Sequence, residues 1–166
     1  MYFVAKHPIQ IRQAKPEDAA TVAQLLHSAF IEFRSLYTPE GFAATALTPE
    51  QVLTRFSEGP VWLVHRDSTA LGTVAAVPNG LSIYMRGMGV PPSARGIGVG
   101  SLLLEKVELW TTAKGCSRIF LSTTPFLHTA IRLYEKHNFR RIDVEPQDLF
   151  GTPLFTMEKI LVSNES

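Results

Sequence analysis

The glycine-rich stretch at residues 87–110 constrains the fold most, because a strand pattern changes there into a turn and then into a helix. Apolar residues alternate before the turn, and two prolines end that strand because proline cannot donate a ladder hydrogen bond. After the turn, apolar residues recur at helical spacing. The glycines between them let backbone N–H groups approach an anion at the positive end of the helix dipole. The stretch therefore predicts a phosphate-binding turn.

Two common phosphate-binding motifs do not fit this turn. A Walker loop needs Gly-Lys-Ser or Gly-Lys-Thr, whereas Gly100 is followed by Ser101 and Leu102. A dinucleotide-binding fingerprint counted from Gly96 needs a third glycine at the position that Ser101 occupies. The turn is thus neither of these, and a tight turn that binds no ligand is the structural alternative.

A different pattern does fit, namely Arg-x-x-Gly-x-Gly at residues 95–100 after a strand that ends Met-Gly-Val-Pro at residues 88–91. It resembles the acyl-CoA pyrophosphate loop of the GNAT N-acyltransferase superfamily. Residues 130–139 resemble a second pattern of that superfamily, Ala-x-x-Leu-Tyr-x-x-x-Gly-Phe, with Asn138 in place of the glycine. The two patterns occur in the family's order and spacing, which makes them more specific together than either is alone.

The resemblance covers nearly the whole chain and implies its fold class. We expect an α/β (α+β) fold with a mixed, mostly antiparallel central sheet of about seven strands flanked by helices. A single GNAT-like acyltransferase domain is expected at residues 1–162, with a C-terminal tail at residues 163–166. A chain of 166 residues that is 45% hydrophobic suits one domain with a sizeable core.

Local patterns place the elements along the chain. Strands are expected at residues 8–14, 61–66, 71–77, 81–90, 118–123, 141–144 and 154–161. Helices are expected at residues 15–33 and 48–57, after the glycine-rich turn to about residue 113, and at residues 125–137. Residues 35–47 have no clean period, and we interpret them as a loop that either covers the acceptor site or packs on the core. A polar turn at residues 147–148 should separate the last two strands.

The resemblance also implies which residues bind the cosubstrate, acetyl-CoA. They are Met88, Gly89, Val90, Arg95, Gly96, Ile97, Gly98, Val99, Gly100, Ser101 and Tyr134. Tyr134 is in addition the implied catalytic residue, because the family's tyrosine lies near the cofactor sulfur and can protonate the departing thiolate. A plain core position is the other interpretation of this tyrosine. Leu127 stands where many members have an asparagine that contacts the cofactor arm, and Thr123 or Thr124 could compensate.

The acceptor side is less clearly marked in the sequence. Contacts with the acceptor are expected from Tyr37, Phe42, Tyr84 and Arg86. Arg86 could anchor a carboxylate of the acceptor, or it could face solvent from an antiparallel strand. Many family members place a glutamate on the central strand as the general base, but this strand offers no carboxylate. Water, Glu32 and His65 stay open as acceptors of the amine's proton.

Charge and cysteine content limit other functions. Sixteen basic and fifteen acidic residues give a formal charge of +1, so the total charge offers no argument for nucleic acid or a membrane. The single cysteine, Cys116, excludes an internal disulfide and a Cys-rich metal site, and we expect no metal. No apolar run approaches the roughly 20 residues of a membrane helix, and a secretory pattern is missing, so a cytoplasmic location is expected.

The sequence therefore favours an N-acetyltransferase that moves an acetyl group from acetyl-CoA to a primary amine by direct attack in a ternary complex. The acceptor is expected to be a small-molecule or peptide amine, and a homodimer is left open. The alternative is a non-catalytic acyl-CoA-binding or sensor module, which the missing carboxylate favours and Tyr134 opposes. Another phosphorylated ligand, such as a nucleotide, would explain the turn but not the tyrosine pattern.

Overall fold

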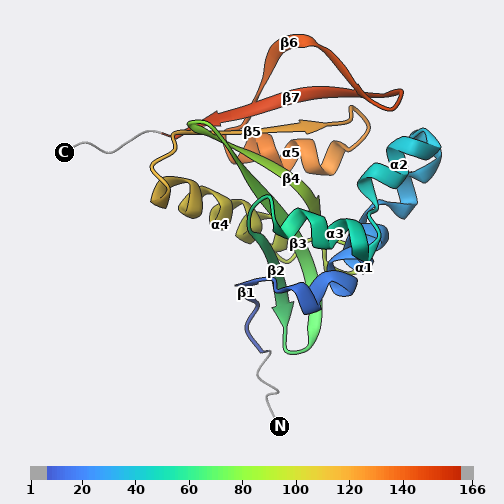
Figure 1. Ribbon diagram of the computed structural model, residues 1–166, viewed down its shortest axis with the longest axis vertical. Helices are drawn as coiled ribbons and strands as arrows, with labels where there is room; N and C mark the ends of the chain where they lie inside the picture. Colours follow the sequence, from blue (N-terminus) through green and yellow to red (C-terminus); the bar gives the residue numbers. More distant parts are fainter. Residues whose placement is uncertain (1–6, 162–166) are drawn as a thin grey trace.

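A seven-stranded sheet runs through the computed structural model, which describes residues 7–161 (Figure 1). Its strands are β1 (Gln10–Gln13), β2 (Val61–Arg66), β3 (Thr69–Asn79), β4 (Ser82–Gly89), β5 (Arg118–Thr123), β6 (Arg140–Leu149) and β7 (Thr152–Ile160). They lie in the order β1-β2-β3-β4-β5-β7-β6, and neighbours are antiparallel except for the parallel pair β4 and β5. The expected fold class is confirmed. The predicted tail at residues 163–166 lies outside the described residues.

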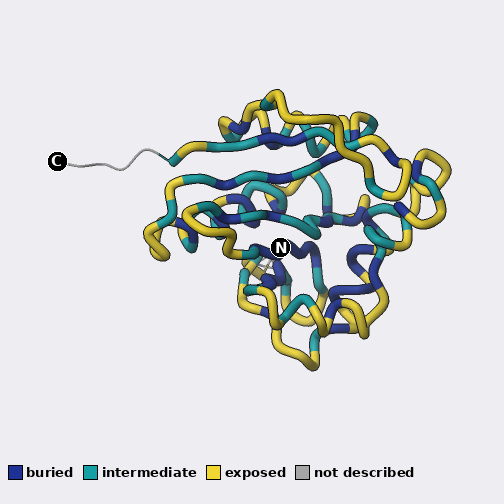
Figure 2. The backbone as a smooth tube through the Cα atoms, turned by 45° about the horizontal axis from the view of Figure 1, so that its top comes forward, coloured by how far each residue is buried: buried dark blue, intermediate teal, exposed yellow. Residues whose placement is uncertain are grey.

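Helices cover both faces of this sheet. They are α1 (Ala19–Phe30), α2 (Pro39–Thr45), α3 (Pro49–Phe56), α4 (Val99–Ala113) and α5 (His128–Lys136). One buried cluster joins α4 and α5 to the sheet through Leu103, Tyr134 and Ile83. A second joins α1 and α3 to it through residues such as Val52 and Leu63. Figure 2 shows the buried segments concentrated along the strands and the helix faces toward them. None of the helices in the described part of the chain is long and apolar enough to cross a membrane.

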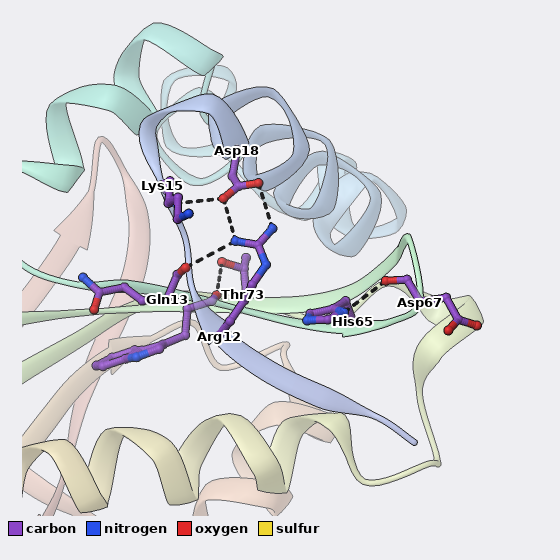
Figure 3. Close-up of polar contacts among 8 residues, drawn as sticks. Arg12, Gln13, Lys15, Asp18, His65, Asp67 and Thr73 are labelled. Atoms are coloured by element: carbon purple, nitrogen blue, oxygen red, sulfur yellow. Dashed lines mark hydrogen bonds and ion pairs between the residues drawn. The ribbon is translucent and has the colours of Figure 1, made fainter. Parts of the chain in front are cut away.

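A charged clamp joins the first strand to the first helix (Figure 3). Arg12 on β1 donates from Nη1 and Nη2 to the two carboxylate oxygens of Asp18, at 2.8 and 2.9 Å. The backbone N–H of Lys15 donates to the same carboxylate at 2.8 Å. These bonds fix a 3₁₀ turn at Pro16–Asp18 that leads into α1. The hydrogen bonds from Arg12 lower the pKa of Asp18 to about 2.

Helix α2 occupies most of residues 35–47, where a loop was predicted. Thr38 caps α2, because its Oγ1 accepts from the Gly41 N–H at 3.0 Å, and a proline follows at the first helical position. Thr38 also donates its backbone N–H to Thr152 Oγ1 at 2.9 Å and its hydroxyl to the Phe150 carbonyl at 2.8 Å. The interpretation as an irregular loop was wrong, and α2 is fixed to the hairpin of β6 and β7.

The last hairpin also turns later than predicted. Gln147 and Asp148 pair with β7, and the turn consists of Phe150 and Gly151, with φ of 49° and 94°. The Asp148 carboxylate accepts from the Gly151 N–H at 2.6 Å, which stabilises this left-handed turn. The prediction failed because β6 is an edge strand, whose polar, exposed residues look like a turn in the sequence.

Candidate active site

Strand β4 bends at Gly87, next to the site. Arg86 and Gly89 pair with β3 residues that are two positions apart, so three steps along β4 oppose two along β3. Such an extra residue is a β-bulge. Gly87 has φ of +60°, in the left-handed region, and a Cβ there would lie 2.8 Å from Nη1 of Arg55. The bulge therefore marks the point at which β4 leaves regular pairing.

Beyond the first half of β4, strands β4 and β5 part. Their parallel pairing joins residues 82–84 to residues 118–120, although β4 continues to Gly89 and β5 to Thr123. A cleft of about 670 Å³ opens there, lined by the later residues of both strands, the glycine-rich turn and α5. Strands that part leave backbone N–H and C=O groups without their ladder partners. The cleft can thus hydrogen-bond a ligand that carries amide groups of its own.

The glycine-rich turn leaves open space beside its backbone. Gly96 and Gly98 have φ of +81° and +88°, and a Cβ on either would meet no atom within 4 Å. Gly98 is the N-cap of α4, whose first-turn N–H groups lack intrahelical acceptors. Gly100 differs, because a Cβ there would lie 2.5 Å from Cδ2 of Leu133 on α5. The first two glycines therefore suit an anion site, whereas the third allows two helices to pack closely.

Arg95 lines the cleft, but its guanidinium already has protein partners. Its Nε donates to the Val90 carbonyl at 3.0 Å, and Nη2 donates to the Ala29 carbonyl at 3.2 Å. Its Nη1 lies 2.5 Å from a carboxylate oxygen of Glu32. The side chain thus ties the end of β4 to α1, and one hydrogen on each terminal nitrogen is left for a ligand.

Tyr134 lies in the wall of the cleft and is only 7% exposed. Burial raises the pKa of its phenol, and the neighbouring phenol of Tyr37 raises it further. Tyr134 is therefore protonated at neutral pH. Thr124, which follows β5, adds a buried hydroxyl oxygen to the same cleft, and this oxygen has no hydrogen-bond partner among the described residues. Both residues thus line the cleft with buried hydroxyl groups.

Most residues predicted for the site line this one cleft. All the predicted cofactor contacts do so except Ile97, whose side chain is 46% exposed. Tyr37, Tyr84 and Arg86 also line it, but Phe42 does not. The Phe42 ring lies 6.1 Å from the Tyr37 ring and 6.2 Å from the His27 ring, between centroids. Phe42 thus supports the wall from behind and does not face the cleft.

The charged side chains of the cleft are all cationic. In residues 7–161 it is lined by no Asp, Glu or His, and its charged residues are Arg55, Arg86, Arg95 and Lys136. Arg55 and Lys136 were not among the site residues predicted from the sequence. Arg55 follows the buried Val52 by three residues on α3, and that spacing places both on one helix face. Lys136 has a weaker signal, because it lies in the exposed last turn of α5.

The side chains considered as proton acceptors lie elsewhere. Glu32 is paired with Arg95, and Nδ1 of His65 lies 3.1 Å from the Asp67 carbonyl (Figure 3). Neither lines the cleft. Glu58 touches a cleft residue, because its Oε2 lies 2.5 Å from Nη2 of Arg86, but it does not line the cleft itself.

Known sequences match the chain over most of its length. The model of the acetyltransferase (GNAT) family matches residues 23–139. An uncharacterised N-acetyltransferase of Schizosaccharomyces pombe is 36% identical over 84 residues, which are 48% of this chain and 52% of that protein. The match thus spans about half the length of this curated relative.

Solved structures share the fold. The PaiA N-acetyltransferase of Thermoplasma acidophilum, solved with coenzyme A, matches with a TM-score of 0.79 and 19% identity, over 92% of this chain and 99% of that one. YncA of Salmonella typhimurium, solved with acetyl-CoA, matches with a TM-score of 0.72 and 17% identity, over 95% and 96% of the two chains. With the family model covering more than half of its residues, this chain belongs to the GNAT family of acetyltransferases.

Proposed function

We propose that this chain is an acetyl-CoA-dependent N-acetyltransferase, which moves an acetyl group to a primary amine by direct attack within one ternary complex. The observation behind the proposal is that one cleft is lined by the glycine-rich turn, by the parted ends of β4 and β5, and by the buried Tyr134. An anion site and a proton donor thus share a single cavity, as group transfer from an anionic cofactor requires.

The residues of the cleft fit acetyl-CoA. The first-turn N–H groups of α4, with Arg95 and Lys136, would hold the pyrophosphate. Backbone groups of Met88 and Val90, together with the Thr124 hydroxyl, would bond the amides of the pantetheine arm. When bound, acetyl-CoA would supply an acetyl group that its thioester linkage already activates.

Tyr134 would act as the proton donor. It would hold a proton at Oη and donate it toward the sulfur as the thiolate leaves, and the raised pKa keeps this proton in place across the neutral range. Cys116 does not line the cleft, which favours direct attack over an acyl-cysteine route.

The amine must lose its own proton before it attacks, and within the described residues the cleft offers no carboxylate or imidazole to take it. We propose that water takes this proton and that the amine reacts from its neutral fraction. The same observation favours the second candidate, a non-catalytic acyl-CoA-binding module with this fold.

An assay of purified protein tests both candidates. Acetyl-CoA is mixed with a broad panel of primary amines while free thiol is followed, and CoA binding is titrated separately by calorimetry. Turnover with any amine supports the acetyltransferase. CoA binding without turnover across the panel supports the binding module, and failure to bind CoA contradicts both.

A further inference from the structure

We propose that the acceptor amine carries a carboxylate, as amino acids do, and that this carboxylate binds to Arg55 on α3 and Arg86 on β4. The proposal rests on the acetyl transfer proposed above and names the substrate class of the same cleft. Both side chains line the cleft, and the anionic cofactor does not account for either of them.

The positions of the four cations separate them into two pairs. Arg86 lies on β4 before the bulge, and Arg55 lies in the last turn of α3. Lys136 lies beside the glycine-rich turn, because the next residue, His137, contacts Ser101 through Nε2 and Oγ at 3.0 Å. The fourth cation, Arg95, lies in the turn itself. The phosphates of a cofactor held at the turn therefore account for the second pair and leave Arg55 and Arg86 unexplained.

The positive charge of Arg55 and Arg86 is only partly balanced by a carboxylate. Glu58 accepts from Nη2 of Arg86, but the buried Nε of Arg86 has no acceptor among the described residues. In residues 7–161, Arg55 forms no ion pair at all. Burial and the charge of Arg86 lower the pKa of Arg55 to about 10, which still leaves it cationic at neutral pH. Two guanidinium groups and one carboxylate thus leave one positive charge without a partner.

The repulsion between Arg55 and Arg86 is unfavourable, and a bound anion would reduce it. Two neighbouring guanidinium groups repel each other, and burial removes part of the water that would otherwise screen them. Nη1 of Arg55 lies beside the bulge, 2.8 Å from the point that a Cβ on Gly87 would occupy. A carboxylate accepts two parallel N–H bonds from a guanidinium, and its single charge matches the single unbalanced positive charge. A phosphate monoester would bring nearly two negative charges.

The test compares each standard amino acid that has a primary amine with its own amide, which replaces the carboxylate with a neutral group of similar size. The amine of the amide is less basic, so more of it is neutral, and greater amine reactivity cannot explain a preference for the acid. We expect kcat/KM of the preferred amino acid to exceed that of its amide at least about tenfold, mainly through KM, as loss of a charge-assisted hydrogen bond implies.

Five variants, one of them a control, assign this preference to the arginine pair. Arg55→Met should abolish it and leave CoA affinity unchanged, whereas Arg55→Lys should keep part of it. Glu58→Gln should lower KM for the amino acid, because it removes the competing carboxylate. Arg132→Gln is the matched control, since Arg132 is exposed and lies outside the cleft, and it should change nothing. Arg86→Gln should act like Arg55→Met, which covers the case in which either variant folds poorly.

The outcomes separate this proposal from the proposed function. Wild-type turnover with equal kcat/KM for acids and amides overturns the carboxylate site and leaves the acetyltransferase intact. If no amine turns over, the calorimetric titration of CoA-loaded protein with the amino acids decides. Binding that depends on Arg55 supports the carboxylate site although the enzymatic proposal fails, and an absence of binding overturns the site as well.

Discussion

Tyr134 combines burial, a position in the cleft wall and a raised pKa, which together describe a group that keeps its proton until a charge develops nearby. We expect Tyr134→Phe to lower kcat by roughly a hundredfold or less, because a general acid contributes about 10²–10⁴ and a thiolate leaves readily unaided. CoA affinity should stay the same, since the ring is kept and the lost interaction acts at the transition state. Steady-state kinetics and CoA calorimetry measure the two effects separately.

Tyr37→Phe is the matched control for this experiment, because it removes another phenol that lines the same cleft. This variant should raise KM for the acceptor more than it lowers kcat. Equal kcat values for the wild type and Tyr134→Phe would remove Tyr134 from the chemistry and leave it as a packing residue.

Arg95 has a structural and a proposed binding role that variants can separate. Arg95→Ala should weaken CoA binding about tenfold to a hundredfold. It should also lower the melting temperature, because the bonds to the Val90 and Ala29 carbonyls are lost. Glu32→Gln removes the ion pair and keeps the guanidinium, so CoA should bind it at least as tightly as it binds the wild type. Unchanged CoA affinity in Arg95→Ala would mean that Arg95 only braces the turn.

The residues that the sequence indicated and those that it missed differ in one respect. Arg95 and Tyr134 belong to short motifs, in which neighbours along the chain determine the local geometry. Arg55 reaches the cleft from a helix about thirty residues before the bulge, and only the folded chain brings the two together. Helical spacing could show that Arg55 faces inward, but it could not show what it faces.

At the scale of elements, the clamp between β1 and α1 predicts a pH effect. Asp18→Asn should lower the free energy of unfolding at pH 7 by on the order of 1 kcal/mol, as the loss of a helix-start hydrogen bond does. The pKa of Asp18 falls from 3.8 to about 2 on folding, so its stabilising effect is complete above about pH 4 and is lost as the pH falls through 2. Urea unfolding at pH 7 and near pH 2 should give a difference between the two proteins only at the higher pH. A difference of equal size at both would assign the effect to packing.

Two helices begin with the same three residues, but only one of these helices was predicted from the sequence. Thr-Pro-Glu begins at Thr38 and again at Thr48, and both threonines cap a helix in the structure. The second was recognised because an apolar face follows it, whereas α2 is short and buries little besides Gly41. The helix at residues 39–45 is fixed by contacts with the β6–β7 hairpin, and such long-range contacts cannot be read from local periodicity.

The bulge in β4 corresponds to a change in the pattern of apolar residues in the sequence. Apolar residues of the strand fall on odd positions up to Met85 and on even positions from Met88, and this change of parity coincides with the extra residue at the bulge. An alternation that changes phase next to a glycine is therefore a usable signal for such a site.

At the scale of the whole molecule, the strands could be predicted individually but their neighbours could not. Local apolar patterns and turn residues predicted all seven strands, and the helix between β4 and β5 indicated a parallel crossover. That β7 lies between β5 and β6 follows from no local pattern. The overall sheet came from the family resemblance, which reflects how an entire chain packs.

The parting of β4 and β5 also affects how the molecule holds together. Four strands lie on one side of this seam and three on the other, and the only backbone ladder across it joins residues 82–84 to residues 118–120 among the described strands. The two halves are otherwise joined mainly by the side chains of α4 and its neighbours in the larger core cluster. A ligand that hydrogen-bonds to both β4 and β5 would join the two halves of the sheet. Binding of such a ligand would therefore stabilise the sheet against separation of its halves. Without the ligand, the sheet should open between β4 and β5 before it opens anywhere else.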